Sequence, residues 1–130
     1  MNHRTTLLAA GILGVTGVAL GAFGAHALRE SLLERGTSSA WETGARYQLI
    51  HAVVVFAAAA WLRAGTGPGT VRMQWAVRCW IVGTVLFAGS LYGLALSGPH
   101  FLVFLTPIGG VTLLSGWVMA LAAALVVKDP

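Results

Sequence analysis

The sequence predicts an all-α fold, an integral membrane four-helix transmembrane bundle that forms a single membrane domain over residues 1–130. Hydrophobic residues make up 57% of the chain and charged residues only 9%, whereas soluble domains carry roughly 25% charged residues. The mean hydropathy is +0.80, and a soluble fold of this length has too little interior to bury so much apolar surface. Soluble enzymes are therefore excluded. Nucleic acid is excluded as a partner because the eight basic residues are scattered and form no patch.

Charged residues mark the ends of most of the four apolar segments in the sequence. A spanning helix needs about 20 mostly apolar residues, because the hydrocarbon core is about 30 Å thick and a helix rises 1.5 Å per residue. The expected spans are about 5–28, 45–63, 78–96 and 106–127. The last two spans are separated by Ser97-Gly98-Pro99, since Gly and Pro end helices. We expect Thr106 to be the N-cap of the last span, with Pro107 at its first helical position.

The first two spans need separate justification. Ala25-His26-Ala27 has the form of a signal-peptide cleavage site, but the apolar run before it exceeds the roughly 7–15 residues of a signal peptide. We therefore interpret the run as a span. The segment 28–35, with Gly36 as its stop, either lies in the membrane interface or extends span one. Ser39 and Glu42 have the spacing of a capping box, so the second helix should begin there, ahead of its apolar part.

The distribution of basic residues predicts the orientation. Four spans place both termini and the second loop on one side of the membrane. The basic residues on that side are Arg4, Arg63, Arg72, Arg78 and Lys128. The opposite side carries Arg29, Arg35 and Arg46, which are offset by three glutamates. The positive-inside rule therefore predicts that both termini are cytoplasmic, in a multi-pass protein of the cytoplasmic membrane.

Glycine pairs predict where the helices pack. Gly17 and Gly21 form one GxxxG pair, and Gly89 and Gly93 form another. Lipid tails remove the hydrophobic drive between spans, so helices associate where small residues allow close approach. We expect these four glycines to lie at helix packing faces. The same faces could mediate a homo-oligomer or docking to a larger membrane complex, and the lipid bilayer surrounds the rest.

A group of polar side chains marks a candidate site, because ionisable groups within a span are costly and often functional. The candidate residues are His26, Arg46, Tyr47, Gln48, His51 and Tyr92. His26 lies near the end of span one and His51 one to two turns inside span two, so we expect them at similar depth. Tyr47 precedes His51 by four residues and shares its face. Tyr92, near the outer end of span three, either anchors the helix at the interface or reaches the same cluster.

Four interpretations of this cluster remain open. It could be a hydrogen-bond network between spans one and two, or a metal or haem site with two imidazole ligands. It could bind a quinone or another lipid-soluble molecule, or pass protons or ions. The sequence identifies no cofactor and no metal. No carboxylate lies within any span, which removes carboxylate catalysis.

Four separated motifs carry a family resemblance. They are GAFGAHAL at 21–28, the segment 41–52, the segment 83–92 and TPIGG at 106–110. Together they resemble the small membrane-protein family called domain of unknown function 423, which includes bacterial relatives of transmembrane protein 256. The resemblance implies a four-span protein of the bacterial cytoplasmic membrane and supplies no activity. It singles out as motif positions His26, Tyr47, Gln48, His51, Ser90, Tyr92 and Thr106.

These observations favour a non-enzymatic structural or accessory protein that packs with itself or with a larger membrane complex. The alternative is a binding protein for a lipid-soluble small molecule or cofactor, such as a quinone, haem or metal. That ligand would bind at the cluster of His, Tyr and Gln residues in the outer half.

Overall fold

A computed structural model of the chain describes residues 1–127. Within this range the chain forms α-helices and no strands. The helices are α1 (His3–Ala25), α2 (Arg29–Glu34), α3 (Ser38–Ala64), α4 (Pro68–Ala95) and α5 (Leu102–Ala124). All of them except α2 are long and apolar enough to cross a membrane. The predicted all-α membrane fold is therefore confirmed.

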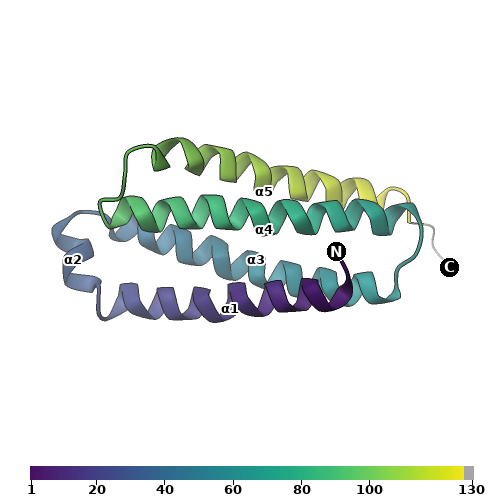
Figure 1. Ribbon diagram of the computed structural model, residues 1–130, viewed down its shortest axis with the longest axis horizontal. Helices are drawn as coiled ribbons and strands as arrows, with labels where there is room; N and C mark the ends of the chain where they lie inside the picture. Colours follow the sequence, from purple (N-terminus) through teal and green to yellow (C-terminus); the bar gives the residue numbers. More distant parts are fainter. Residues whose placement is uncertain (128–130) are drawn as a thin grey trace.

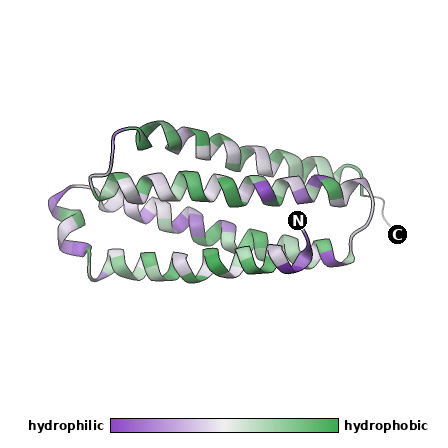
Figure 2. Ribbon diagram, viewed as in Figure 1, coloured by the Kyte–Doolittle hydropathy of each residue, from purple (hydrophilic) through white to green (hydrophobic). Residues whose placement is uncertain are grey.

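The four long helices lie side by side and alternate in direction (Figure 1). α3 packs against α1 and α4, and α4 packs against α5. The central helices α3 and α4 each bury 39% of their most apolar window, whereas α1 and α5 bury 17%. Apolar residues predominate along α1 and α5 (Figure 2), and many of their large side chains are exposed, as expected for helices that face lipid.

The two ends of the bundle differ. At one end α1 begins, α5 ends and the α3–α4 connection turns; we call it the terminal end (Figure 1). At this end His3 Nδ1 lies 2.9 Å from the carbonyl oxygen of Ala59. The opposite end carries α2 and the α4–α5 connection, and we call it the α2 end. Lys128, which contributed to the orientation expected above, lies outside the described residues.

The short helix α2 covers the α2 end. α1 stops at Ala25, so the segment 28–35 is a separate helix and does not extend span one. Leu32 is 2% exposed and packs against Trp41 and Ala95. Gly36 ends the helix with φ +66, a left-handed conformation that favours glycine. These contacts hold α2 against the bundle.

Two helix starts differ from the sequence predictions. The Thr37 hydroxyl donates to the Ala95 carbonyl oxygen at 2.9 Å. This bond holds the chain at Thr37, so α3 begins at Ser38 and the capping box predicted at Ser39 is wrong. α5 begins at Leu102, so Pro107 lies inside the helix rather than at its start. Pro107 has no N–H, so it removes one backbone hydrogen bond from the second turn of α5.

The closest helix packing occurs between α4 and α5. A Cβ at Gly109 would overlap the backbone nitrogen of Phe87, and a Cβ at Gly83 would lie 2.8 Å from the Leu113 nitrogen. Each helix therefore supplies a glycine at which the other approaches. These glycines belong to neither predicted GxxxG pair.

Only one member of each predicted GxxxG pair lies close to another side chain. A Cβ at Gly17 would lie 2.9 Å from Leu49 Cδ2. At Gly93 it would lie 2.5 Å from Leu102 Cδ1. A Cβ added at Gly21 or at Gly89 would meet no other atom within 4 Å. Neither pair therefore forms a contact within the chain through both of its glycines.

Candidate functional site: a polar cluster between three helices

Gln48 joins three helices through its side-chain amide. It lies on α3 and is 5% exposed. Its Nε2 donates to the Leu13 carbonyl oxygen at 3.0 Å and to Thr16 Oγ1 at 2.7 Å, both on α1. Its Oε1 accepts from the Tyr92 hydroxyl on α4 at 2.9 Å. Both amide protons and the amide oxygen are therefore used in contacts within the chain.

Trp41 extends this arrangement towards the α2 end. Its indole N–H donates to the Leu20 carbonyl oxygen at 2.8 Å, and its ring centroid lies 4.7 Å from that of Tyr92. Two glycines make room for the rings: a Cβ at Gly24 would overlap the Trp41 indole, and a Cβ at Gly44 would lie 3.0 Å from Tyr92 Cε1. The side chains that we call the Gln48 cluster are Thr16, Trp41, Gln48 and Tyr92.

His51 belongs to a second, aromatic group one turn further along α3. It is 4% exposed, and its Nδ1 lies 2.8 Å from the Tyr47 carbonyl oxygen. A carbonyl only accepts, so we assign the ring proton to Nδ1. The unprotonated Nε2 then accepts from the Trp117 indole N–H at 3.4 Å. The Tyr47 ring packs on Phe87, and the Trp117 ring packs on Trp80.

Two further motif positions link α4 to α5. Ser90 Oγ and Thr106 Oγ1 lie 2.7 Å apart. Ser90 also donates to the Phe87 carbonyl oxygen at 2.9 Å. This pair of hydroxyls connects the two helices one residue before Pro107.

The structure separates the six predicted site residues. Gln48 and Tyr92 hydrogen-bond to each other, and Tyr47 and His51 share the aromatic group. His26 is exposed at the C-cap of α1, and Arg46 is exposed on α3, so both lie outside the two groups. The similar depth expected for the two histidines is wrong, because α3 begins earlier than expected. At 1.5 Å per residue His51 lies about 20 Å along α3 from its start, whereas His26 lies at the α2 end.

Two members of the Gln48 cluster were missed by sequence reasoning. Thr16 is one of the few hydroxyls within span one, and a buried Gln needs such a partner. Trp41 was not included among the site residues. Its indole N–H is the signal that was available, because a buried Trp usually donates a hydrogen bond.

The chemistry of the Gln48 cluster is that of a hydrogen-bonded connection between helices. Among residues 1–127, no group of three or more His, Cys, Asp or Glu side chains could hold a metal ion. Every polar atom of the Gln48 amide has a partner within the chain. The arrangement therefore holds α1, α3 and α4 in register.

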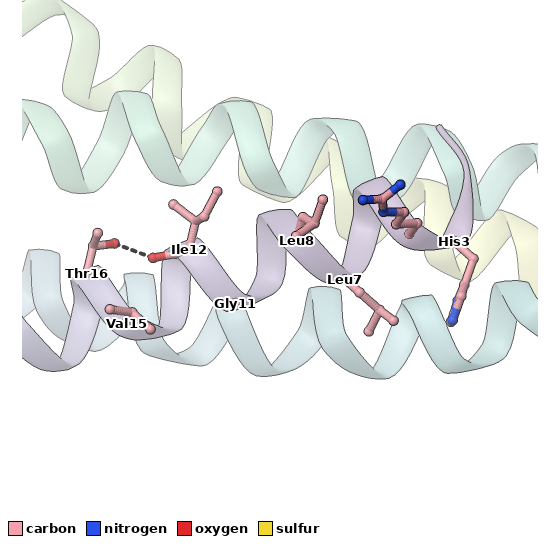
Figure 3. Close-up of a pocket in the computed structure, with 8 residues that line it drawn as sticks. His3, Leu7, Leu8, Gly11, Ile12, Val15 and Thr16 are labelled. Atoms are coloured by element: carbon pink, nitrogen blue, oxygen red, sulfur yellow. Dashed lines mark hydrogen bonds between the residues drawn. The ribbon is translucent and has the colours of Figure 1, made fainter.

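The surface of α1 carries a hollow of about 650 Å³. Its lining residues all come from α1, and its apolar part is formed by Leu7, Leu8, Gly11, Ile12 and Val15 (Figure 3). Thr16 borders the hollow, and its hydroxyl donates to the Ile12 carbonyl oxygen at 2.7 Å. The hollow faces outward and meets the Gln48 cluster at Thr16.

The fold and the polar clusters define a small multi-pass α-helical membrane protein whose Gln48 cluster is hydrogen-bonded within the chain, to other side chains and to backbone carbonyls. Comparison with known proteins agrees with this class. The chain belongs to the family described as Protein of unknown function (DUF423), whose model matches residues 20–110. The resemblance noted in the sequence is thereby confirmed.

The relatives are membrane proteins. The UPF0382 inner membrane protein YgdD of Escherichia coli strain K12 is 39% identical over 131 residues, covering 98% of this chain and 95% of the relative. A UPF0382 membrane protein of Haemophilus influenzae is 40% identical and covers 90% of this chain and 89% of the relative. The UPF0382 membrane protein YwdK of Bacillus subtilis is 34% identical and covers 93% of this chain and 96% of the relative. No solved structure matches this chain. The relatives and the candidate spans confirm the predicted inner-membrane location.

Proposed function

We propose that this protein is a non-enzymatic membrane component that acts by assembly, with a second copy of the chain as its partner. The contact uses the outward face of α1, at Leu8, Gly11, Ile12 and Val15. Docking of a different membrane protein on the same face is the alternative outcome of the test below.

The observation that carries this proposal is the unused space around Gly11. A Cβ there would meet nothing within 4 Å, although glycine inside a helix costs about 1 kcal/mol relative to alanine. Leu8, Ile12 and Val15 around it are 55%, 63% and 73% exposed. In lipid, apolar side chains alone do not drive association, and a glycine lets a second backbone approach closely. A helix from another chain would use the space that this chain leaves open.

The polar clusters support the same proposal indirectly. Both amide protons of Gln48 are used in contacts within the chain, so the amide offers no free donor to a quinone carbonyl. A lipid-soluble ligand at the His, Tyr and Gln residues therefore has less support than assembly.

We also propose that both termini face the cytoplasm. Arg63, Arg72 and Arg78 lie towards the terminal end together with Arg4. The arginines towards the α2 end, Arg29, Arg35 and Arg46, are accompanied by Glu30, Glu34 and Glu42. The positive-inside rule supports a cytoplasmic terminal end. Labelling of a cysteine introduced at Asn2, compared with one at Gly36, by a membrane-impermeant reagent in intact cells tests this orientation.

The assembly is tested by replacing Gly11 with leucine. The variant should keep its helix content, because the substituted side chain meets open space, and it should lose the dimer on native mass spectrometry in mild detergent. Gly89→Leu is the matched control, since Gly89 on α4 also has nothing within 4 Å but lies outside the proposed face. In membranes, Leu8→Cys combined with Cys79→Ser should cross-link to a dimer.

Three outcomes would overturn the proposed assembly. The first is a wild-type chain that stays monomeric both in native mass spectrometry and in membrane cross-linking. The second is a dimer that survives Gly11→Leu. The third is cross-linking of Leu8→Cys to a different protein only, which would show docking to a larger complex instead.

A further inference from the structure

Three hollows follow one side of the seam between α1 and α3. The first hollow, of about 360 Å³, is the one furthest from α2. It lies between Gly14 and Val18 on α1 and Leu49 and Val53 on α3. The next, of about 310 Å³, continues towards the α2 end, and the third, of about 390 Å³, reaches α2. The second and third share Gly24, Ala25, Trp41 and Glu42.

The linings of the three hollows follow the same faces of α1 and α3, although the first and second hollows share no lining residue. On α1 the lining residues Val18, Gly21 and Ala25 follow at steps of three and four. On α3 the lining residues Val53, Leu49, Arg46 and Glu42 follow at the same steps. Such steps keep residues on one face of a helix. We call this feature the α1/α3 groove; it meets the hollow of Figure 3 only at Gly11.

The length of the groove matches one leaflet of a bilayer. From Phe56 to Glu42 it extends about 21 Å along α3 at 1.5 Å per residue. Half of a hydrocarbon core about 30 Å thick is about 15 Å. The groove is therefore long enough to cover one leaflet and the adjoining headgroup region at the α2 end.

The chemistry of the lining changes along this length. The deep part is formed by Gly14, Val18, Leu49, Val53 and Phe56, which are apolar. The part at the α2 end is bordered by the charged side chains of Arg29, Glu42 and Arg46, which are exposed. Gly21 keeps the groove open, because a Cβ there would meet nothing within 4 Å. An apolar groove that ends in charged side chains of both signs is complementary to a lipid with a zwitterionic headgroup.

We propose that the α1/α3 groove binds one phospholipid with a phosphoethanolamine headgroup, from the leaflet at the α2 end. An acyl chain occupies the apolar part. Arg29 and Arg46 bind the phosphate, which guanidinium groups recognise through paired hydrogen bonds. Glu42 binds the ammonium group. A carboxylate beside two guanidiniums favours a head that carries both charges over a purely anionic head, because Glu42 repels the anion and attracts the amine.

The proposed lipid site and the proposed assembly face lie on different sides of α1 and meet at Gly11. The lipid site lies on the side of α1 next to α3, and a monomeric chain would bind the lipid as well. Native mass spectrometry reports the number of chains and the number of retained lipids in the same spectrum, so failure of one proposal is distinguishable from failure of the other.

The experiment uses the full chain, reconstituted in bilayers with equal amounts of phosphatidylethanolamine and phosphatidylglycerol and then released into mild detergent. The wild type should retain one phosphatidylethanolamine per chain, in preference to phosphatidylglycerol. Glu42→Gln should reduce this preference by about two- to fivefold, which corresponds to the loss of one exposed ion pair. Arg46→Gln should lower retention of both lipids. Glu30→Gln and Arg63→Gln, which change charges outside the groove, should behave like the wild type.

A second variant tests the apolar part without changing any charge. Gly21→Leu fills the groove and should abolish lipid retention with an unchanged far-UV circular dichroism spectrum. The proposal is overturned if no lipid is retained by the wild type, or if Gly21→Leu retains as much as the wild type. It is also overturned if phosphatidylglycerol is retained equally well and Glu42→Gln leaves the ratio unchanged.

Discussion

Replacing Gln48 with leucine should lower the free energy of unfolding by about 2 kcal/mol while the helices persist. The substitution removes three hydrogen bonds between helices, each worth about 0.6 kcal/mol on average in a membrane protein. Leucine has a similar volume, so no large cavity adds to the loss. Thr16 keeps its bond to the Ile12 carbonyl oxygen, which leaves the Tyr92 hydroxyl as the side chain that loses its partner.

Tyr92→Phe separates one of the three bonds from the others. It removes only the bond to Gln48 Oε1 and keeps the ring beside Trp41, so the loss should be about 0.6 kcal/mol. The double variant should be no less stable than Gln48→Leu alone, because both changes remove the same bond. Gln74→Leu, on α4 outside the Gln48 cluster, is the control for added hydrophobicity.

The assay is reversible unfolding by increasing mole fractions of sodium dodecyl sulphate in mixed micelles, followed by tryptophan fluorescence and circular dichroism. Equal losses for Gln48→Leu and Tyr92→Phe would show that the two bonds from Gln48 to α1 contribute nothing. An unchanged stability for Gln48→Leu would refute the conclusion that the cluster holds the three helices together.

Two further predictions use the same assay. Gly109→Ala should lower the free energy of unfolding by about 1–3 kcal/mol, because the added methyl group overlaps the backbone of Phe87. Gly89→Ala should leave it unchanged or raise it by up to about 1 kcal/mol. The reverse order of stabilities would contradict the packing described for α4 and α5. Arg72→Met should cost about 0.5–1 kcal/mol, because Arg72 Nη1 donates to the Ala122 carbonyl oxygen in the last turn of α5 at 2.7 Å. Arg72→Lys keeps the charge and should recover part of this loss.

The fold could be predicted from the sequence because the exclusion of charged residues from the hydrocarbon core is visible in short sequence segments. A charge in the hydrocarbon core is so costly that the positions of Arg4, Arg29, Arg46 and Arg63 indicate the approximate limits of the apolar segments. Helix ends depend on tertiary contacts and were less predictable. Thr37 begins α3 by bonding to α4, which no local pattern indicates.

The candidate site was predictable in its residues and not in its partners. Gln48 and Tyr92 stand out as polar groups in apolar helices. Their pairing depends on how α3 and α4 are rotated about their axes, and the bonds to α1 involve the Leu13 backbone carbonyl, which has no sequence signature. Rotation also decides which glycines pack: Gly109 contacts a neighbouring helix, whereas Gly21 borders open space.

The neighbour relations of the helices have a consequence for how the protein forms during synthesis. Each long helix packs mainly against the long helix that precedes or follows it in the chain. A newly inserted helix therefore finds its partner already in the membrane and does not wait for a distant segment. Low sequence separation between contacting elements speeds folding and shortens the time during which unpaired surfaces are exposed. The bundle can thus form during synthesis one helix pair at a time, with α5 packing onto an α4 that is already in the membrane.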